Sequence, residues 1–252
     1  MTSIPLNSSA ALDVSVVMAV YNGMRFIGPQ LQSLLADLRP DDEVVVVDDA
    51  STDETPSFIA SIGDARVRYC RNERNLGVRR SFEKAIGLAR HPIICLCDQD
   101  DVWVRGKRQA VVTTFENDPG CVLVIHDAQV IDAQDAVTST SFMQTRGGFN
   151  PGIGSNLLRN KYLGCAMSFR ARLRSVILPI PATVPMHDMW IGLLAKATGS
   201  VAYLPSPYLL YRRHGGNVSP GSRAPLWTML KWRWQLAFNL LYRLATASRT
   251  QN

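Results

Sequence analysis

Three carboxylates lie within four residues, at Asp98, Asp100 and Asp101 around Gln99, directly after the apolar run 93–97. Carboxylates this close raise each other's pKa unless a cation lies between them. Mg²⁺ or Mn²⁺ relieves the repulsion by binding one or two carboxylates and completing its shell with phosphate oxygens and water. The run therefore predicts a divalent metal site; a solvated acidic turn or a helix N-cap cluster is the alternative.

Other ligand sites with recognisable motifs are excluded. An EF-hand starting at Asp98 would need Gly at its sixth position and Glu at its twelfth, and neither is present. The chain also lacks G-x-x-x-x-G-K-[ST] and a strand-linked G-x-G-x-x-G, the best markers of P-loop and dinucleotide sites. Cys95 and Cys97 are spaced C-x-C, a weak pattern for zinc or redox chemistry.

Two later residues are further candidates. Asp188 precedes an apolar pattern with helical spacing (Trp190, Leu193, Leu194, Ala197), so we expect it at a helix N-terminus. It is either an N-cap, a pocket-facing carboxylate, or both. His214 lies in a basic, turn-rich loop, 211–217, where it is either structural or a ligand.

The elements that must position these residues alternate along the first half. Apolar runs predict strands at 14–20, 43–47, 66–70 and 92–97. Amphipathic stretches predict helices at 24–38, 53–62, 79–89 and 107–117. This alternation indicates an α/β protein with a mainly parallel, Rossmann-like sheet flanked by helices.

A polar cluster follows each of the four predicted strands. These clusters are 21–23, 48–51, 72–77 and 98–101. Any one of them could be ordinary turn chemistry. Open parallel sheets, however, bind ligands beyond the carboxyl ends of their strands, so four such clusters predict one pocket.

The second half is less regular. We expect strands at 121–126, 165–169 and 201–204, a loop at 146–155 and a helix at 189–198. Segment 226–244 is dense in Trp, Leu, Phe and Tyr but carries Lys231, Arg233 and Arg243, too many charges to span a bilayer. Its aromatic residues are expected to spread around the helix. It suits either the headgroup boundary of an anionic membrane or packing against protein.

Bulk composition sets the remaining limits. The 252 residues are 46% hydrophobic and 19% charged, enough for one α/β domain or two packed halves. The net charge of +6 favours acidic partners, but no nucleic-acid-binding motif is recognisable. The first dozen residues do not form a secretory signal and the five cysteines form no regular framework, which predicts a cytoplasmic location.

A set of motifs resembles a known family. In order they are V-S-V-V-M-A-V-Y-N from Val14, E-V-V-V-V-D-D-A-S-T-D from Glu43, N-x-x-x-N-L-G near Asn72, C-D-Q-D-D-V-W from Cys97, H-D-M-W from His187 and Y-R-R-H-G-G-N from Tyr211. This series resembles the family 2 glycosyltransferases, inverting bacterial enzymes with the GT-A fold, and extends over residues 14–219. D-Q-D-D-V-W and H-D-M-W look most like the branch with rhamnosyltransferases of surface-polysaccharide assembly.

The resemblance implies roles in donor binding. Ala19, Val20, Tyr21 and Asn22 would line the nucleotide site, although the family often has Pro where this chain has Ala19. Asp49 would accept a hydrogen bond from the pyrimidine ring, while Asp48 supports the strand end.

It also implies the catalytic groups. Asp98 and Asp100 would form the D-x-D element around Gln99, with Asp100 the direct ligand of Mg²⁺ or Mn²⁺ and Asp98 nearer the ribose. Asp188 would be the catalytic base. His214 would lie in a late loop that closes over the diphosphate and would assist the metal.

The implied reaction moves a sugar from a nucleotide diphosphate sugar to a hydroxyl of a glycan or lipid-linked acceptor. The expected organisation is a flexible start (1–12), a nucleotide-sugar half (13–120), an acceptor and catalytic half (121–220) and a membrane-associated helical end (221–252). This places the protein peripherally on the inner face of the plasma membrane. The rivals are a nucleotidyltransferase, which usually has a basic Gly-rich loop after its first strand, and an inactive nucleotide-sugar-binding scaffold.

Overall fold

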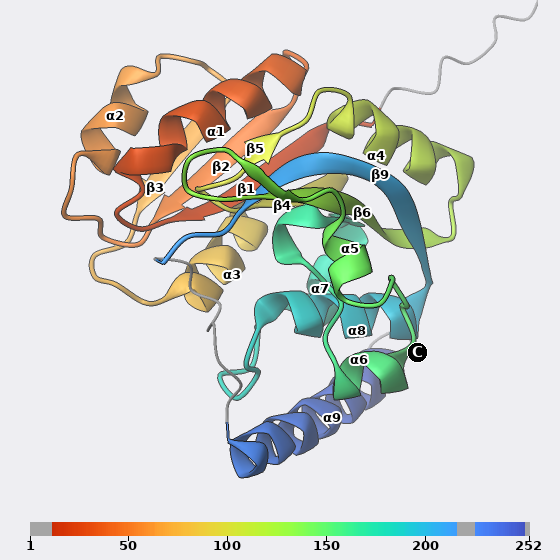
Figure 1. The fold of residues 1–252 in the computed structure, drawn as a ribbon. Helices are drawn as coiled ribbons and strands as arrows, with labels where there is room; N and C mark the ends of the chain where they lie inside the picture. The colour runs from red at the N-terminus through yellow and green to blue at the C-terminus, as the bar shows by residue number, and fades with distance from the viewer. Residues whose placement is uncertain (1–11, 216–224, 250–252) are drawn as a thin grey trace, which may run out of the picture.

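Four parallel strands form one half of the central sheet in the computed structural model, which describes residues 12–215 and 225–249 (Figure 1). Their order is β3 (Val67–Arg71), β2 (Glu43–Asp48), β1 (Val14–Val20) and β4 (Ile93–Cys97). β2 and β4 are buried along their whole length, as β-branched strands covered on both faces should be. The predicted parallel sheet is confirmed in this half.

Helices follow these strands as expected. They are α1 (Met24–Asp37), α2 (Thr55–Ser61), α3 (Val78–Leu88) and α4 (Lys107–Asn117). α1 buries Ile27, Leu31 and Leu34, which recur every turn along one side of the helix. In Figure 1, α1 and α2 lie above the sheet and α3 lies below it, where it packs on β1 and β2.

The other half of the sheet is mixed rather than parallel. β8 (Met167–Arg170) runs antiparallel between β4 and β6 (Cys121–Ile131), and β6 pairs in parallel with β9 (Ser200–Arg212). Two short strands were not predicted. They are β5 (Val102–Trp103), which pairs with β9, and β7 (Val137–Ser139), which pairs with β6.

β6 and β9 are both longer than their predicted strands, which ended at the first polar residues or prolines. The β6–β9 register shifts beside Asp127, which lies opposite Pro207, so the irregular pairing accommodates these residues within continuous strands.

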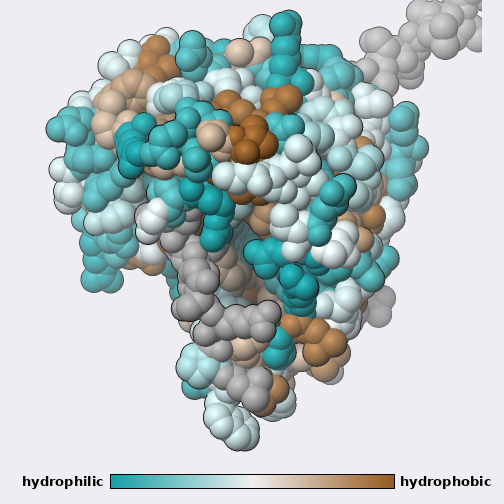
Figure 2. Space-filling view, in the orientation of Figure 1, coloured by the Kyte–Doolittle hydropathy of each residue, from teal (hydrophilic) through white to brown (hydrophobic). Residues whose placement is uncertain are grey.

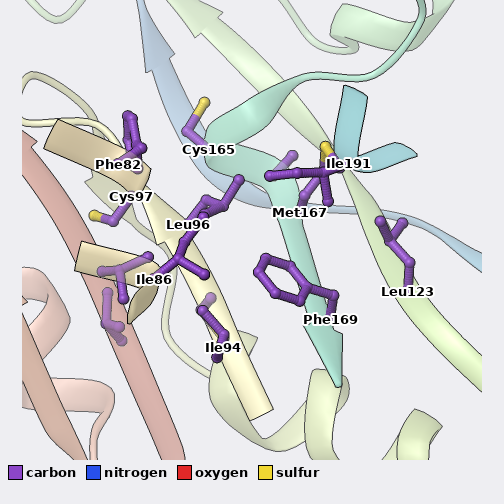
Figure 3. Close-up of a cluster of buried hydrophobic side chains, with 14 of the residues drawn as sticks. Phe82, Ile86, Ile94, Leu96, Cys97, Leu123, Cys165, Met167, Phe169 and Ile191 are labelled. Atoms are coloured by element: carbon purple, nitrogen blue, oxygen red, sulfur yellow. The ribbon is translucent and has the colours of Figure 1, made fainter. Parts of the chain in front are cut away.

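Short elements connect the second half. They are α5 (Phe142–Thr145), α6 (Ile153–Leu158), η1 (Gly164–Ala166), η2 (Ala171–Leu173) and α7 (Arg174–Ile177). The predicted loop at 146–155 is therefore wrong at its end, where α6 begins. α8 (His187–Thr198) starts two residues earlier than predicted and is buried for its first nine residues. Figure 3 shows Leu96 of β4, Met167 and Phe169 of β8, and Ile191 of α8 in one apolar cluster.

The C-terminal helix α9 (Leu226–Arg249) crosses the base of the molecule next to α6, α7 and α8 (Figure 1). Its Leu236 and Leu240 are buried, and Arg233 donates to the carbonyls of Leu157 and Leu158 at the end of α6. One side of α9 is thus fixed to the domain. Among residues 12–215 and 225–249, no helix is long and apolar enough to cross a membrane.

Candidate active site

The carboxyl ends of β1, β2 and β4 carry loops that are hydrogen-bonded to each other. Gln99 Oε1 accepts from the Tyr21 N–H (2.9 Å), and Gln99 Nε2 donates to the Tyr21 carbonyl (3.2 Å). Asn22 Oδ1 accepts from the Thr52 N–H (2.8 Å). A Cβ on Gly23 would lie 2.6 Å from Gln99 Oε1, so this loop needs glycine for the close approach. The predicted strand-end clusters do meet at one edge of the sheet.

The paired aspartates after β2 have different environments. Asp48 is fully buried; its carboxylate accepts from the Ser51 N–H (2.9 Å) and the Tyr69 hydroxyl (2.6 Å), which fixes the strand end. Asp49 accepts hydrogen bonds from Asn72 Nδ2 and from two backbone N–H groups, those of Leu76 and Gly77.

These hydrogen bonds determine the charge of Asp49. Burial raises the pKa of Asp49, but the hydrogen bonds to its ionised form more than offset burial and hold the pKa below its usual range. The Ser81 hydroxyl also lowers the pKa of Asp49. Asp49 is therefore a charged acceptor among protein donors at the carboxyl end of β2.

The acidic run after β4 forms a buried cluster with Cys165. Ligand atoms of Asp98, Asp101 and Cys165 lie within 4.8 Å of one another. Burial raises the pKa of Asp98 well above its usual range, and the neighbouring charges of Asp101, Asp100 and Asp188 raise it further. Burial, together with the Asp100 charge, also raises the pKa of Asp101, to about 7. Such a cluster favours a bound cation or proton.

Asp101 joins the loop after β4 to the end of β9 by a hydrogen bond. Its Oδ1 accepts from the Arg212 N–H (2.9 Å), while its buried Oδ2 has no hydrogen-bond partner within the described residues. Arg212 Nε donates to the Asp100 carbonyl (2.7 Å), and its guanidinium lies 4.9 Å from the centroid of the Phe26 ring. The buried ammonium of Lys107 lowers the pKa of Asp101 from the core side.

His214 meets Asp100 directly. His214 Nε2 lies 2.8 Å from Asp100 Oδ2, and its imidazole packs on the Phe26 ring at 4.8 Å between centroids. The preceding Tyr211 and Arg212 belong to β9, so the predicted loop starts two residues later than expected. Residues 216 and 217 of that loop lie outside the described residues. The structure brings together two of the three residues, Asp98, Asp100 and His214, that the sequence analysis placed at the metal.

Asp188 lies in the first turn of α8 and is almost fully buried. Asp188 Oδ1 accepts from the Met189 N–H (2.6 Å), and Oδ2 accepts from Asn160 Nδ2 (3.3 Å). Burial raises the pKa of Asp188 to about 6. The expectation that Asp188 is the N-cap is wrong, because Met186 occupies that position and provides no side-chain cap.

The neighbouring His187 is buried and only weakly basic. His187 stacks on Phe82 with 4.3 Å between ring centroids, and burial lowers the pKa of His187 to about 4. It is therefore neutral near pH 7, with no hydrogen bond to its Nε2 within the described residues. Of the two side chains that begin α8, only Asp188 acts electrostatically on the acidic cluster.

A model of the family described as Glycosyl transferase family 2 matches residues 15–178, about two thirds of the chain. The chain belongs to glycosyl transferase family 2. The family predicted from the ordered motifs is thereby confirmed.

Known proteins agree with this assignment. The chain is 27% identical over 213 residues to an uncharacterized protein of Mycobacterium tuberculosis, covering 81% of this chain but only 60% of that protein. It is 26% identical over 194 residues to the putative teichuronic acid biosynthesis glycosyltransferase TuaG of Bacillus subtilis, covering 75% of this chain and 74% of TuaG. The crystal structure of S. aureus TarS 1–349 with UDP-GlcNAc superposes with a TM-score of 0.72 at 17% identity, over 90% of this chain and 66% of that one. This superposition confirms the GT-A fold.

Family 2 glycosyltransferases commonly use a divalent metal, and the donor set of this site fits one. Asp98 and Asp100 offer oxygen ligands and His214 a nitrogen, a set that suits Mg²⁺ or Mn²⁺. Cys165 offers a thiol sulfur, a soft ligand that suits neither Mg²⁺ nor Mn²⁺. An ion held here would draw its oxygen ligands from the run 98–101, where Asp98 and Asp101 lie close together and Asp100 contacts His214.

Two residues of the site were not anticipated from sequence. Asn160 contacts the Asp188 carboxylate, and buried Gln30 donates to the Asp98 carbonyl (2.8 Å). Gln30 could have been noticed in the sequence, because it is a polar residue on the apolar stripe of α1, between Ile27 and Leu31. Asn160 could not, because its contact is with Asp188, 28 residues later in the chain.

Proposed function

We propose that this chain is an inverting glycosyltransferase that moves a sugar from a nucleotide diphosphate sugar to a hydroxyl of a glycan or lipid-linked acceptor. The observation that carries the proposal is that Asp188 lies next to the acidic cluster. A Cβ on Gly164 would lie 3.5 Å from Asp188 Cβ, and the next residue, Cys165, has its sulfur within 4.8 Å of ligand atoms of Asp98 and Asp101. A buried carboxyl whose pKa lies at about 6 is ionised near pH 7 yet basic enough to accept a proton.

In the proposed reaction, Asp188 takes the proton of the acceptor hydroxyl while that oxygen attacks the anomeric carbon. The bond from this carbon to the diphosphate oxygen breaks, the electron pair leaves with the nucleoside diphosphate, and the configuration inverts. The Asn160 amide and the Met189 N–H hold the carboxylate in position. A divalent ion, when bound, would neutralise charge on the departing diphosphate.

We assign donor binding to residues 13–120. Ala19, Val20, Tyr21 and Asn22 would line the nucleotide site, and Asp49 would accept from the base. Gln99 supports this assignment, since it ties the first of these loops to the D-x-D run. Residues 121–220 would then supply the acceptor side and the base.

For the pathway, we propose polysaccharide biosynthesis, in keeping with the teichuronic acid role in TuaG's name. Rhamnose is the sugar to test first, because D-Q-D-D-V-W and H-D-M-W resemble rhamnosyltransferases. A panel of nucleotide sugars with Mn²⁺ should reveal the donor by a rise in melting temperature and by turnover. Release of a nucleoside diphosphate supports the proposal, pyrophosphate would indicate a nucleotidyltransferase, and donor binding without turnover would indicate a scaffold.

We further propose that α9 docks on an anionic membrane surface from the cytoplasmic side. Trp227 (82% exposed) and Trp234 (71% exposed) lie on one helix face with Phe238 and Leu241. Exposed Trp232 lies off this face, so the aromatic residues do spread around the helix, as expected. Residues 226–249 include no Asp or Glu, and exposed Lys231 adds positive charge, which complements anionic headgroups.

Two arginines of α9 contact the domain, in keeping with the alternative that this segment packs against protein. Arg233 caps the end of α6, and Arg243 donates to the carbonyls of Val176, Leu178 and Pro179 at the end of α7 and just beyond it. Deleting α9 would uncover the core, so point variants are the better test. Trp234→Ser with Phe238→Ser should abolish flotation with phosphatidylglycerol vesicles, while Val137→Ser, at an exposed site on β7, should not. Equal flotation of all three proteins would refute the docking.

A further inference from the structure

A cavity of about 330 Å³ lies between the β6–β7 hairpin, α5 and the end of β9. Its walls include Thr138 and Ser139 from β7, Phe142 and Arg146 from the α5 segment, and Tyr211 and Arg213. The α5 wall is held in place by buried Asp127, which accepts from the Ser141 hydroxyl and the Met143 N–H. The cavity is thus a built feature of the fold that the donor assignment does not use.

Two guanidinium groups give this cavity its charge. Arg146 lies 5.1 Å from the centroid of Phe142, and Arg213 lies 5.9 Å from that of Tyr211. The lining includes no Asp or Glu, and neither arginine has a carboxylate within ion-pair distance in the described part of the chain. Planar guanidinium groups on aromatic faces are well suited to binding phosphate oxygens in pairs.

The cavity also lies beside the reaction site. The Arg146 charge lowers the pKa of Asp188, against the larger opposing effect of burial. On the other wall, the backbone that carries Tyr211 and Arg213 contacts the acidic run. The Arg212 N–H donates to Asp101 Oδ1, and His214 Nε2 lies 2.8 Å from Asp100 Oδ2. An anion bound by the arginines would therefore lie close to the acidic run. Hydrophilic side chains surround a hollow in the face of the molecule seen in Figure 2.

We propose that Arg146 and Arg213 bind a phosphate group of the acceptor, and that the acceptor is therefore a sugar carried on a phosphate- or diphosphate-linked lipid. This inference rests on the proposed function and narrows its acceptor class. The donor diphosphate is assigned to the metal site at Asp98 and Asp100 and to His214. Arg213 belongs to the same loop as His214, but its guanidinium lies over Tyr211 in the cavity lining, so we assign it with Arg146 to a second phosphate-bearing ligand. Apolar surface from Val130 and the two aromatic rings would contact the start of the lipid.

The test is binding of geranyl diphosphate to the full chain in EDTA, where metal-dependent donor binding is absent. Arg146→Gln and Arg213→Gln should each weaken binding about tenfold, as expected for losing a charge-assisted hydrogen bond. The matched control is Arg90→Gln, an exposed arginine at the opposite end of β4. Geraniol has no phosphate for the arginines to bind. Its affinity should therefore be equal for the wild type, the two arginine variants and the control variant.

A second arm separates the acceptor from the donor. Mn²⁺-dependent binding of nucleoside diphosphates should be unchanged in both arginine variants. Loss of that binding instead would assign the arginines to the donor and overturn the proposal, as would geranyl diphosphate affinity equal to that of the wild type. If no donor is turned over but geranyl diphosphate binding still depends on both arginines, the transferase proposal fails while the phosphate site stands.

Discussion

Replacing Asp188 with Asn should abolish most turnover and, at neutral pH, stabilise the fold. Burial raises the pKa of Asp188 from 3.8 to about 6. A pKa shift of about two pH units lowers the free energy of unfolding by about 3 kcal/mol at pH values where this carboxylate is ionised. Asn carries no charge and avoids that cost. Loss of a positioned base should lower turnover at least ~10²-fold.

The net gain in unfolding free energy from Asp188→Asn is smaller than the cost of holding the carboxylate ionised. The Asn side chain can still accept from the Met189 N–H, but its amide nitrogen would face Asn160 Nδ2, so one hydrogen bond worth about 1 kcal/mol is lost. The expected gain in unfolding free energy is therefore about 2 kcal/mol at pH 7.5. Because the pKa of Asp188 is higher in the folded chain, the cost to the wild type develops between about pH 4 and 6 and is constant above. The gain should shrink as the pH falls from 7.5 to 5.

Urea unfolding of wild type and variant in EDTA at both pH values measures this difference. Asp41→Asn, at an exposed carboxylate, is the matched control and should leave stability unchanged. An Asp188→Asn protein with near-normal turnover would show that Asp188 is not the base. A variant less stable than the wild type at pH 7.5 would show that the carboxylate stabilises the fold.

Three further predictions concern the metal, the pH profile and the packing. Asp100→Asn should abolish turnover and Mn²⁺-dependent donor binding in calorimetry without changing the melting temperature, and an EDTA-resistant rate would contradict this. The wild-type kcat/KM should fall as the pH drops below about 6, because Asp188 gains its proton there; a flat profile from pH 7.5 to 5 would contradict a carboxylate base. Gly192→Ala should cost about 1–3 kcal/mol in urea unfolding, because the new Cβ would lie 2.4 Å from the Tyr162 ring; unchanged stability would mean that the ring moves freely.

The sequence predicted the first half of the chain well, because its elements are local. Apolar runs and turn-flanked helices fix β1 to β4 within one or two residues, and parallel strands necessarily bring their carboxyl ends together. The pairing of Asp100 with His214 spans 114 residues, and the motifs could suggest it only through the resemblance.

The second half of the chain was harder to predict, for physical reasons. β6 and β9 continue through polar residues and prolines that periodicity treats as strand ends, because bulges accommodate them. The partner of Asp188 lies on a loop whose sequence carries no pattern. On α9, the sequence showed the cations but not that Arg233 and Arg243 bind carbonyls of the domain. Such contacts depend on tertiary packing, which local composition does not encode.

The most direct test of the central claim is the stereochemistry and metal dependence of donor cleavage. The protein is incubated with Mn²⁺ and the donor selected from the nucleotide-sugar panel, and the reaction is followed by proton NMR. We expect signals of the released nucleoside diphosphate, and we expect the released sugar to appear first with the anomeric configuration opposite to that of the donor. Both signals should disappear in EDTA and in Asp188→Asn. Cleavage with retained configuration, or cleavage that persists in either condition, would contradict the account.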